Sequence, residues 1–124
     1  MGKFVIKPSA KGVMFNLKAS NGEIIASSQV YKTLATCKKG IASVQRIAPV
    51  ANLEDQTEKD FKQEKNPKFE VYTDKKGETR FRLKASNGQI VATGEGYSTK
   101  KACLNGVESV RKNAANSTIE KADK

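Results

Sequence analysis

The sequence predicts an α+β fold in which two tandem copies of a β-β-β-α-β unit share one hydrophobic core. Three observations predict it: an internal duplication, strands that alternate polar and apolar residues before an Asn-Gly pair, and one apolar helical stripe in each copy. Each copy has only about 60 residues, and units of that size are marginal alone because they bury too little surface. We therefore expect one cooperative domain.

The duplication is visible in the letters. The hexapeptide LKASNG stands at 17–22 and again at 83–88. Up to Gly12 the two copies are offset by 65 residues, and after one inserted residue the offset becomes 66. Identical pairs outside the hexapeptide include Phe4 and Phe69, Phe15 and Phe81, Tyr31 and Tyr97, Thr33 and Thr99, Cys37 and Cys103, and Gly40 and Gly106.

Each copy begins with an antiparallel meander of three strands. The segment RFRLKA at 80–85 alternates charged and apolar side chains with the period of two that is typical of a half-buried strand. SNG follows this strand in both copies, and Asn-Gly tolerates positive φ at both central positions of a two-residue turn. We expect a tight hairpin there, and an earlier turn at Gly12 and Gly77.

A helix follows the third strand in each copy. Thr33 and Ser98–Thr99 are the predicted N-caps, and Pro49 ends the first helix. The apolar stripes face the sheet, and VANLED and NSTIEK follow as short fourth strands. The stripe residues are Leu34, Cys37, Ile41, Val44 and Ala48 in the first helix and Cys103, Val107, Val110 and Ala114 in the second.

A glycine and a tyrosine occupy equivalent positions at the helices of both copies. Gly40 and Gly106 indicate that a neighbour approaches each helix closely, most simply the sheet or the other helix. Tyr31 and Tyr97 precede the caps, and we expect them to pack back onto the helices. The predicted organisation is a first repeat at 1–57, a linker at 58–66 and a second repeat at 67–124.

The second copy, RFRLKASNGQIVATGEGYSTKKACLNGVESVRKNA with a short strand after it, resembles the YegP-like family of small bacterial proteins of unknown function. The resemblance covers nearly the whole chain, and such proteins occur as single repeats that pair or as tandem repeats. It implies a single antiparallel sheet with both helices on one face and with the C-terminal strand of each repeat exchanged onto the other. It implies no activity, substrate or catalytic residue.

The first copy departs from this pattern at two places. Ser28–Val30 stands where the second copy has Gly94–Gly96, and Lys38-Lys39 stands where it has Leu104-Asn105. These differences argue against two identical binding sites.

The composition points away from an enzyme. The chain has no histidine, which excludes Cys/His zinc sites and nucleophile systems that depend on a histidine base. Glu54 and Glu120 are the one pair of carboxylates that occupies equivalent positions in the two copies. This pair does not suggest an active site. We expect no catalytic residue, no cofactor and no metal. Without a secretory signal or a long apolar run, we expect a cytoplasmic protein that does not enter membranes.

The formal net charge of +10 is the main functional clue. Bases outnumber acids by eight to three in residues 1–57 and by twelve to seven in 67–124, so each copy contributes +5. Such a protein is expected to associate with polyanions. The candidate contacts on the open sheet face are Arg80, Arg82, Lys84 and Tyr72. In the alternative that we favour, Glu70 and Asp74 neutralise Arg80 and Arg82 across the strands.

A second candidate polyanion contact lies in TGEGYSTKKA at 93–102. Lys100 and Lys101 fall in the first turn of the second helix, where free backbone amides attract anions. The stretch matches no phosphate-loop pattern, however. The favoured interpretation is that Gly94 and Gly96 only permit a tight connection from strand to helix.

Cys37 and Cys103 lie at the same place on the two stripes. They are either reduced core thiols, which is our preferred interpretation, or a redox-sensitive pair brought together by the pseudo-twofold axis. We predict a non-enzymatic binding or interaction protein, monomeric with internal pseudo-twofold symmetry. Its partner is an unidentified protein or, alternatively, a nucleic acid or other polyanion bound on the open sheet face.

Overall fold

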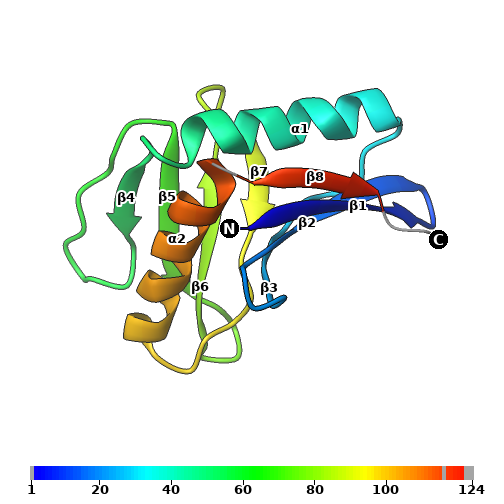
Figure 1. Ribbon diagram of the computed structural model, residues 1–124. Coiled ribbons are helices and arrows are strands. Elements are labelled where there is room, and N and C mark those ends of the chain that lie inside the picture. The colour runs from blue at the N-terminus through cyan, green and yellow to red at the C-terminus, as the bar shows by residue number, and fades with distance from the viewer. Residues whose placement is uncertain (1, 116, 122–124) are drawn as a thin grey trace.

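The computed structural model describes residues 2–115 and 117–121, and it contains the predicted elements in the predicted order (Figure 1). No helix in these ranges is both long and apolar enough to cross a membrane. The first repeat consists of β1 (Lys3–Ser9), β2 (Gly12–Lys18), β3 (Ile24–Ser27), α1 (Leu34–Ile47) and β4 (Asn52–Asp55). The second consists of β5 (Lys68–Thr73), β6 (Thr79–Lys84), β7 (Ile90–Thr93), α2 (Lys100–Ala115) and β8 (Thr118–Lys121).

The eight strands form one sheet in the order β4-β5-β6-β7-β3-β2-β1-β8. The final strand of each repeat therefore lies at the edge of the other repeat, which confirms the predicted exchange. The six meander strands pair antiparallel, whereas β4 runs parallel to β5 and β8 parallel to β1. The sheet is thus mixed at its two edges, whereas the resemblance implied an antiparallel sheet throughout. A parallel neighbour needs a return connection of about a dozen residues, which the segment 56–67 supplies between β4 and β5.

The Asn-Gly turns differ from the two-residue turn that we predicted. The amide of Gly22 donates to the carbonyl of Ala19, and the amide of Ala19 donates to the carbonyl of Glu23. Three residues therefore form the loop, with Gly22 after the turn at φ 86°, and the strand register shifts between Leu17 and Lys18. This is the three-residue loop with a bulge, which also requires glycine at its last position. The second copy repeats it.

One core lies between the sheet and the two helices. In each half two phenylalanines meet edge to face, Phe4 with Phe15 at 5.5 Å and Phe69 with Phe81 at 6.0 Å between ring centroids. The predicted stripes of both helices are part of the same cluster, so both helices cover one face, as predicted. Arg111 of α2 joins the halves, because its guanidinium lies over the Phe69 ring and donates to the carbonyl that ends α1.

The helix caps are as predicted. The Thr33 side chain accepts from the amide of Thr36, and the Thr36 side chain accepts from the amide of Thr33, which makes a reciprocal capping box at α1. The Thr99 side chain accepts from the amide of Ala102 at the start of α2.

The close neighbour of Gly40 and Gly106 is a tyrosine, so our expectation of the sheet or the other helix was wrong. Tyr31 and Tyr97 each pack back onto the helix that follows, as predicted, and their hydroxyl ends lie where a Cβ on Gly40 or Gly106 would be. Each tyrosine also stacks on a core phenylalanine. Gly94 has a similar role, since a Cβ there would overlap the Phe81 ring.

Gly106→Ala should lower the free energy of unfolding, measured by urea denaturation, by about 1–3 kcal/mol, because the new methyl group would meet the Tyr97 hydroxyl at 2.5 Å. Helix propensity alone predicts the opposite sign, a gain of up to about 1 kcal/mol. In a Tyr97→Ala background the same substitution should become neutral or stabilising. A loss of equal size in both backgrounds would contradict this packing.

Candidate functional site

A single row of side chains crosses the open face of the sheet through all eight strands. The strand registers place directly paired residues on the same face. From β8 to β4 the row reads Glu120, Val5, Asn16, Ser27, Thr93, Arg82, Glu70 and Glu54. The two copies meet at Ser27 and Thr93, so the pseudo-twofold axis passes between them.

The predicted contacts on β5 and β6 come together on this face, but acids of the same sheet neutralise the cations. Arg80 Nε lies 2.7 Å from an Asp74 oxygen, and Arg82 Nε lies 2.6 Å from a Glu70 oxygen. Lys84 lies 3.3 Å from Glu70. The Arg82 guanidinium lies over the Tyr72 ring, 4.7 Å from the ring centre. The favoured alternative, cross-strand neutralisation, is therefore confirmed, and this aromatic face is already occupied.

Lys100 also forms ion pairs with acidic residues of the same chain. Its ammonium lies 3.0 Å from Asp55 and 2.6 Å from Glu58, where β4 runs into the linker. The lysine in the first turn of α2 thus anchors the exchanged strand. Lys101 is exposed and has no ion-pair partner among residues 2–115 and 117–121.

The exchange also buries an ion pair that sequence reasoning missed. Glu54 is 1% exposed, and it accepts hydrogen bonds from Lys68 Nζ at 2.7 Å, Gln56 Nε2 at 2.6 Å and the Glu64 amide at 2.7 Å. Burial opposes ionisation, but these three bonds outweigh it and lower the pKa of Glu54 to about 2. Lys68 also contacts Glu70 at 3.3 Å, so the charges form one connected network.

The equivalent pair in the other half is open to water. Lys3 and Glu120 lie 3.5 Å apart, with 42% and 54% of their side chains exposed. Val5 stands where the second half has Glu70, and Asn16 stands where it has Arg82. Because these residues are partners across the strands, both members of the pair differ together between the copies, from neutral to charged.

Glu54→Gln should lower the free energy of unfolding at neutral pH by about 3 kcal/mol, because it leaves a buried ammonium with only Glu70 as counter-ion. The folded pKa of Glu54 lies below the unfolded value of 4.5, so this stabilisation is present above that pH and fades as the pH falls towards 2. The difference in free energy of unfolding between wild type and variant, measured by urea denaturation, should therefore become smaller from pH 7 to pH 2.5.

Glu120→Gln is the matched control, and its cost should stay within about 0–1 kcal/mol, as for surface ion pairs. Equal losses for the two variants, or a gap for Glu54→Gln that does not change with pH, would contradict the account of a buried network.

Strand exchange redistributes the net charge. Residues 1–51 contain eight bases and one acid, a net charge of +7, and β8 adds one of each. Residues 52–115 contain thirteen bases and ten acids, a net charge of +3. We call these the first half and the second half of the fold. The even distribution that the sequence repeats suggest is therefore lost on folding, because β4 carries Glu54 and Asp55 into the second half.

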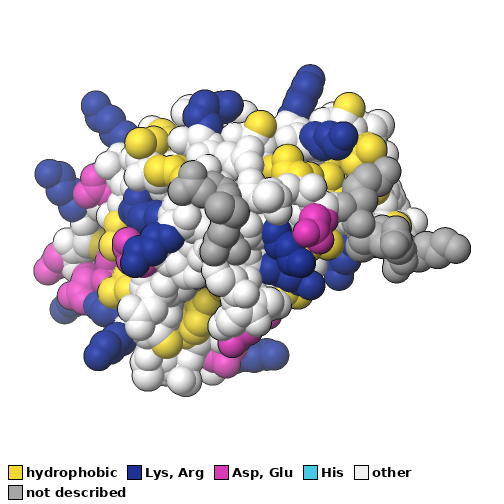
Figure 2. All heavy atoms as spheres, in the orientation of Figure 1, with side chains coloured by type: hydrophobic (Ala, Val, Ile, Leu, Met, Phe, Trp, Pro, Cys, Tyr) yellow, Lys and Arg dark blue, Asp and Glu magenta, His cyan; other side chains and the backbone are white. Residues whose placement is uncertain are grey.

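The positive charge of the first half is also unpaired. Within the described ranges, Lys3 is the one cation of the eight in residues 1–51 that has an ion-pair partner. Four of the others lie on α1 or just before it, and α1 contains no acidic residue. These four, the α1 basic face, are Lys32, Lys38, Lys39 and Arg46. Figure 2 shows basic groups along the edge formed by α1, whereas acidic groups gather near β4 and the linker.

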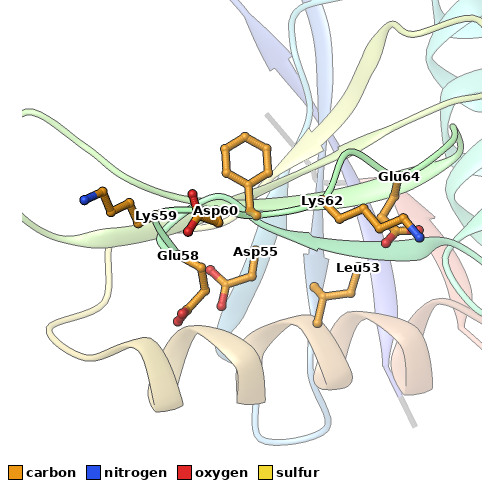
Figure 3. Close-up of a pocket in the computed structure, with 8 residues that line it drawn as sticks. Leu53, Asp55, Glu58, Lys59, Asp60, Lys62 and Glu64 are labelled. Carbon is orange, nitrogen blue, oxygen red and sulfur yellow. The ribbon is translucent and has the colours of Figure 1, made fainter.

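A cavity of about 510 Å³ lies beneath the linker, lined by charged side chains of both signs (Figure 3). Leu53, Asp55 and Glu58 point towards α2 there. Burial tends to raise the pKa of Asp55, but hydrogen bonds from Thr57 and Lys100 outweigh it and lower that pKa. A general acid at neutral pH needs a raised pKa. Two acids of this cavity, Asp55 and Glu58, hold the start of the linker against Lys100.

The two cysteines are free and buried in the core. Burial raises the pKa of both thiols, that of Cys103 to about 11. A thiol of this kind is a poor nucleophile, because the thiolate is the reactive form.

Both cysteines should resist iodoacetamide at pH 8 in the native protein and react fully in urea, as counted by mass spectrometry. Burial and the raised thiol pKa both oppose the reaction. Rapid native labelling of either residue, or formation of an intramolecular disulfide on mild oxidation, would favour the redox-sensitive pair instead.

Residues 9–55 and 74–120 each match a family described as a domain of unknown function, DUF1508. The chain belongs to this family. The UPF0339 protein YegP of Yersinia pestis is 38% identical over 121 residues, which are 97% of this chain and 95% of that one. The resemblance to YegP-like proteins is therefore confirmed.

Two further relatives bear on the architecture. A UPF0339 protein of Treponema denticola is 56% identical over 52 residues, 42% of this chain and 90% of its own length, and thus corresponds to one copy. The solution NMR structure of yegP from E. coli, a protein of unknown function, matches this fold with a TM-score of 0.77 at 32% identity and covers 97% of this chain and 91% of its own.

Proposed function

We propose that this protein is a non-enzymatic binding protein, and that its ligand is a polyanion, such as a nucleic acid, held on the α1 basic face. The observation that carries the proposal is the contrast between the halves. Second-half cations such as Arg82 and Lys100 have acidic partners in the same chain, whereas those on α1 have none among the described residues. Unpaired surface cations are the ones that can exchange counter-ions for phosphates.

The spacing on α1 suits a polymer with regularly repeated charges. Lys38 and Arg46 are both exposed, and eight residues of helix separate them by about 12 Å. One strand of a nucleic acid duplex carries roughly three or four phosphates over that length. Ala35 and Ala42 lie between the cations and offer no ring for stacking. The contacts would therefore be with the backbone and would not read base sequence.

This proposal moves the candidate polyanion surface from the sheet to the helix. Binding at Arg80, Arg82 and Lys84 would require a ligand to displace Asp74 and Glu70. The absence of catalysis is part of the proposal, and it is supported by a chain without histidine and by carboxylates whose pKa values are lowered.

The test compares two double variants with the same net charge, Lys38→Ala/Arg46→Ala on α1 and Lys75→Ala/Lys76→Ala in the exposed turn between β5 and β6. Binding to a fluorescent double-stranded oligonucleotide is measured by anisotropy over a series of salt concentrations. The α1 variant should lower the slope of log K against log salt by about 2, because each lost cation removes roughly one phosphate contact.

The turn variant controls for the overall charge of the protein, and its slope should change by less than half as much. Equal effects of the two variants would show that only the net charge matters. Unchanged binding in the α1 variant would overturn the proposal.

A further inference from the structure

A groove of about 340 Å³ lies between α1 and the turn that joins β6 to β7, and no residue of the described part of the chain fills it. Each copy contributes one wall, because α1 belongs to the first repeat and the turn to the second. The volume is within the range of small-molecule sites in proteins. Among its lining residues are Gln29, Tyr31, Lys39, Ser43, Gln89 and Ile90.

Several donors in this groove are available. Lys39 is exposed and has no ion-pair partner in the described part of the chain. The Ser43 hydroxyl likewise makes no hydrogen bond there, whereas its counterpart Ser109 accepts one from Asn113. Burial raises the pKa of Tyr31 more than a hydrogen bond with Gln29 lowers it, so its hydroxyl stays protonated at neutral pH. Gly40 lets that hydroxyl approach the helix.

The pseudo-twofold axis places the equivalent residues of the other copy between α2 and the turn that joins β2 to β3, and we call this equivalent region the α2 groove. The counterparts of Tyr31, Gly40 and Ser43 are the identical residues Tyr97, Gly106 and Ser109. Glu95 and Glu23 both lie near enough to Tyr97 to add to the rise in its pKa that burial causes, which places an acid on each wall of that groove.

The two grooves differ in charge at three positions, each in the same direction. Gln29 stands for Glu95, and Lys39 stands for Asn105. Gln89 stands for Glu23. The α1 groove therefore carries +1 from these positions, whereas the α2 groove carries −2. The copies have kept the tyrosine, the glycine and the serine at these positions and reversed the charge around them.

We propose that the α1 groove binds a small monocarboxylate with a compact apolar body, the carboxylate at Lys39 and the body against Ile90 and Val91. The ammonium of Lys39 neutralises one negative charge, and the hydroxyls of Tyr31 and Ser43 donate to the same group. A phosphate monoester carries nearly two negative charges at neutral pH, one more than this groove can balance. This site shares Lys39 with the α1 basic face but goes beyond the polyanion surface, because it uses the side of α1 that faces the turn between β6 and β7.

The proposal is tested with phenylacetate as the probe and the ¹⁵N-labelled full-length chain. Saturable shifts of amide signals should map to residues 29–31, 39–43 and 85–91, with a Kd of about 1 mM or below, as for a good fragment. Lys39→Ala should weaken binding at least about tenfold, and phenylacetamide, which lacks the charge, should bind at least about tenfold more weakly than phenylacetate.

A gain of function gives the matched control. Glu23→Gln/Glu95→Gln/Asn105→Lys should create a second saturable site with shifts at 19–25, 95–97 and 105–109, because it gives the α2 groove the charges of the α1 groove. Equal binding of phenylacetamide, tighter binding of phenyl phosphate, or no saturable shifts in the α1 groove would overturn the proposal. Spectra of every variant must keep the wild-type dispersion, which separates loss of the site from loss of the fold.

The two proposals fail independently. Lys38→Ala/Arg46→Ala should leave phenylacetate binding within about twofold, since neither residue lines the groove. If Lys38→Ala/Arg46→Ala abolishes binding of both the oligonucleotide and phenylacetate, the assignment of phenylacetate to a separate groove is overturned.

Discussion

Each repeat donates its last strand to the sheet of the other repeat, and most of the molecule depends on this exchange. A unit of about 60 residues buries too little apolar surface to be stable alone. Pairing β4 with β5 and β8 with β1 makes every repeat complete only in the presence of its twin. The shared core, the single eight-stranded sheet and the contact of Arg111 with both halves follow from it.

The exchange also explains why two copies of one sequence became electrostatically different halves. Glu54 and Asp55 are encoded in the first repeat but neutralise Lys68 and Lys100 of the second. Their departure leaves the first half with almost all its cations unpaired. The linker strengthens the asymmetry, because it follows β4 and covers Glu54, while Glu120 on β8 is open to water. Connectivity alone therefore breaks the symmetry of the duplicated fold.

At two places the copies differ as sets of residues that face one another. The pair of Val5 with Asn16 and the pair of Glu70 with Arg82 differ as units, as expected when a charge on one strand requires a counter-charge on the next. The groove positions differ together in the same way, although they come from different repeats. The scaffold residues, by contrast, are the same in both copies: the core phenylalanines, the capping threonines and each tyrosine with its glycine.

The duplication, the meander, the helix stripes and their caps could be read from the letters, because each depends on residues close together in sequence. The resemblance of the whole chain supplied the exchange of strands. The loop at Gly22 was misjudged by one residue, since both loop types use Asn-Gly and only the hydrogen bonds distinguish them. The pairing of Arg80 and Arg82 with nearby acids followed from simple cross-strand reasoning. Three features could not be predicted in this way: the burial of Glu54, the unpaired charge of α1 and the groove at Lys39. They depend on contacts between segments of different repeats, and the exchange of strands decides which segments come into contact.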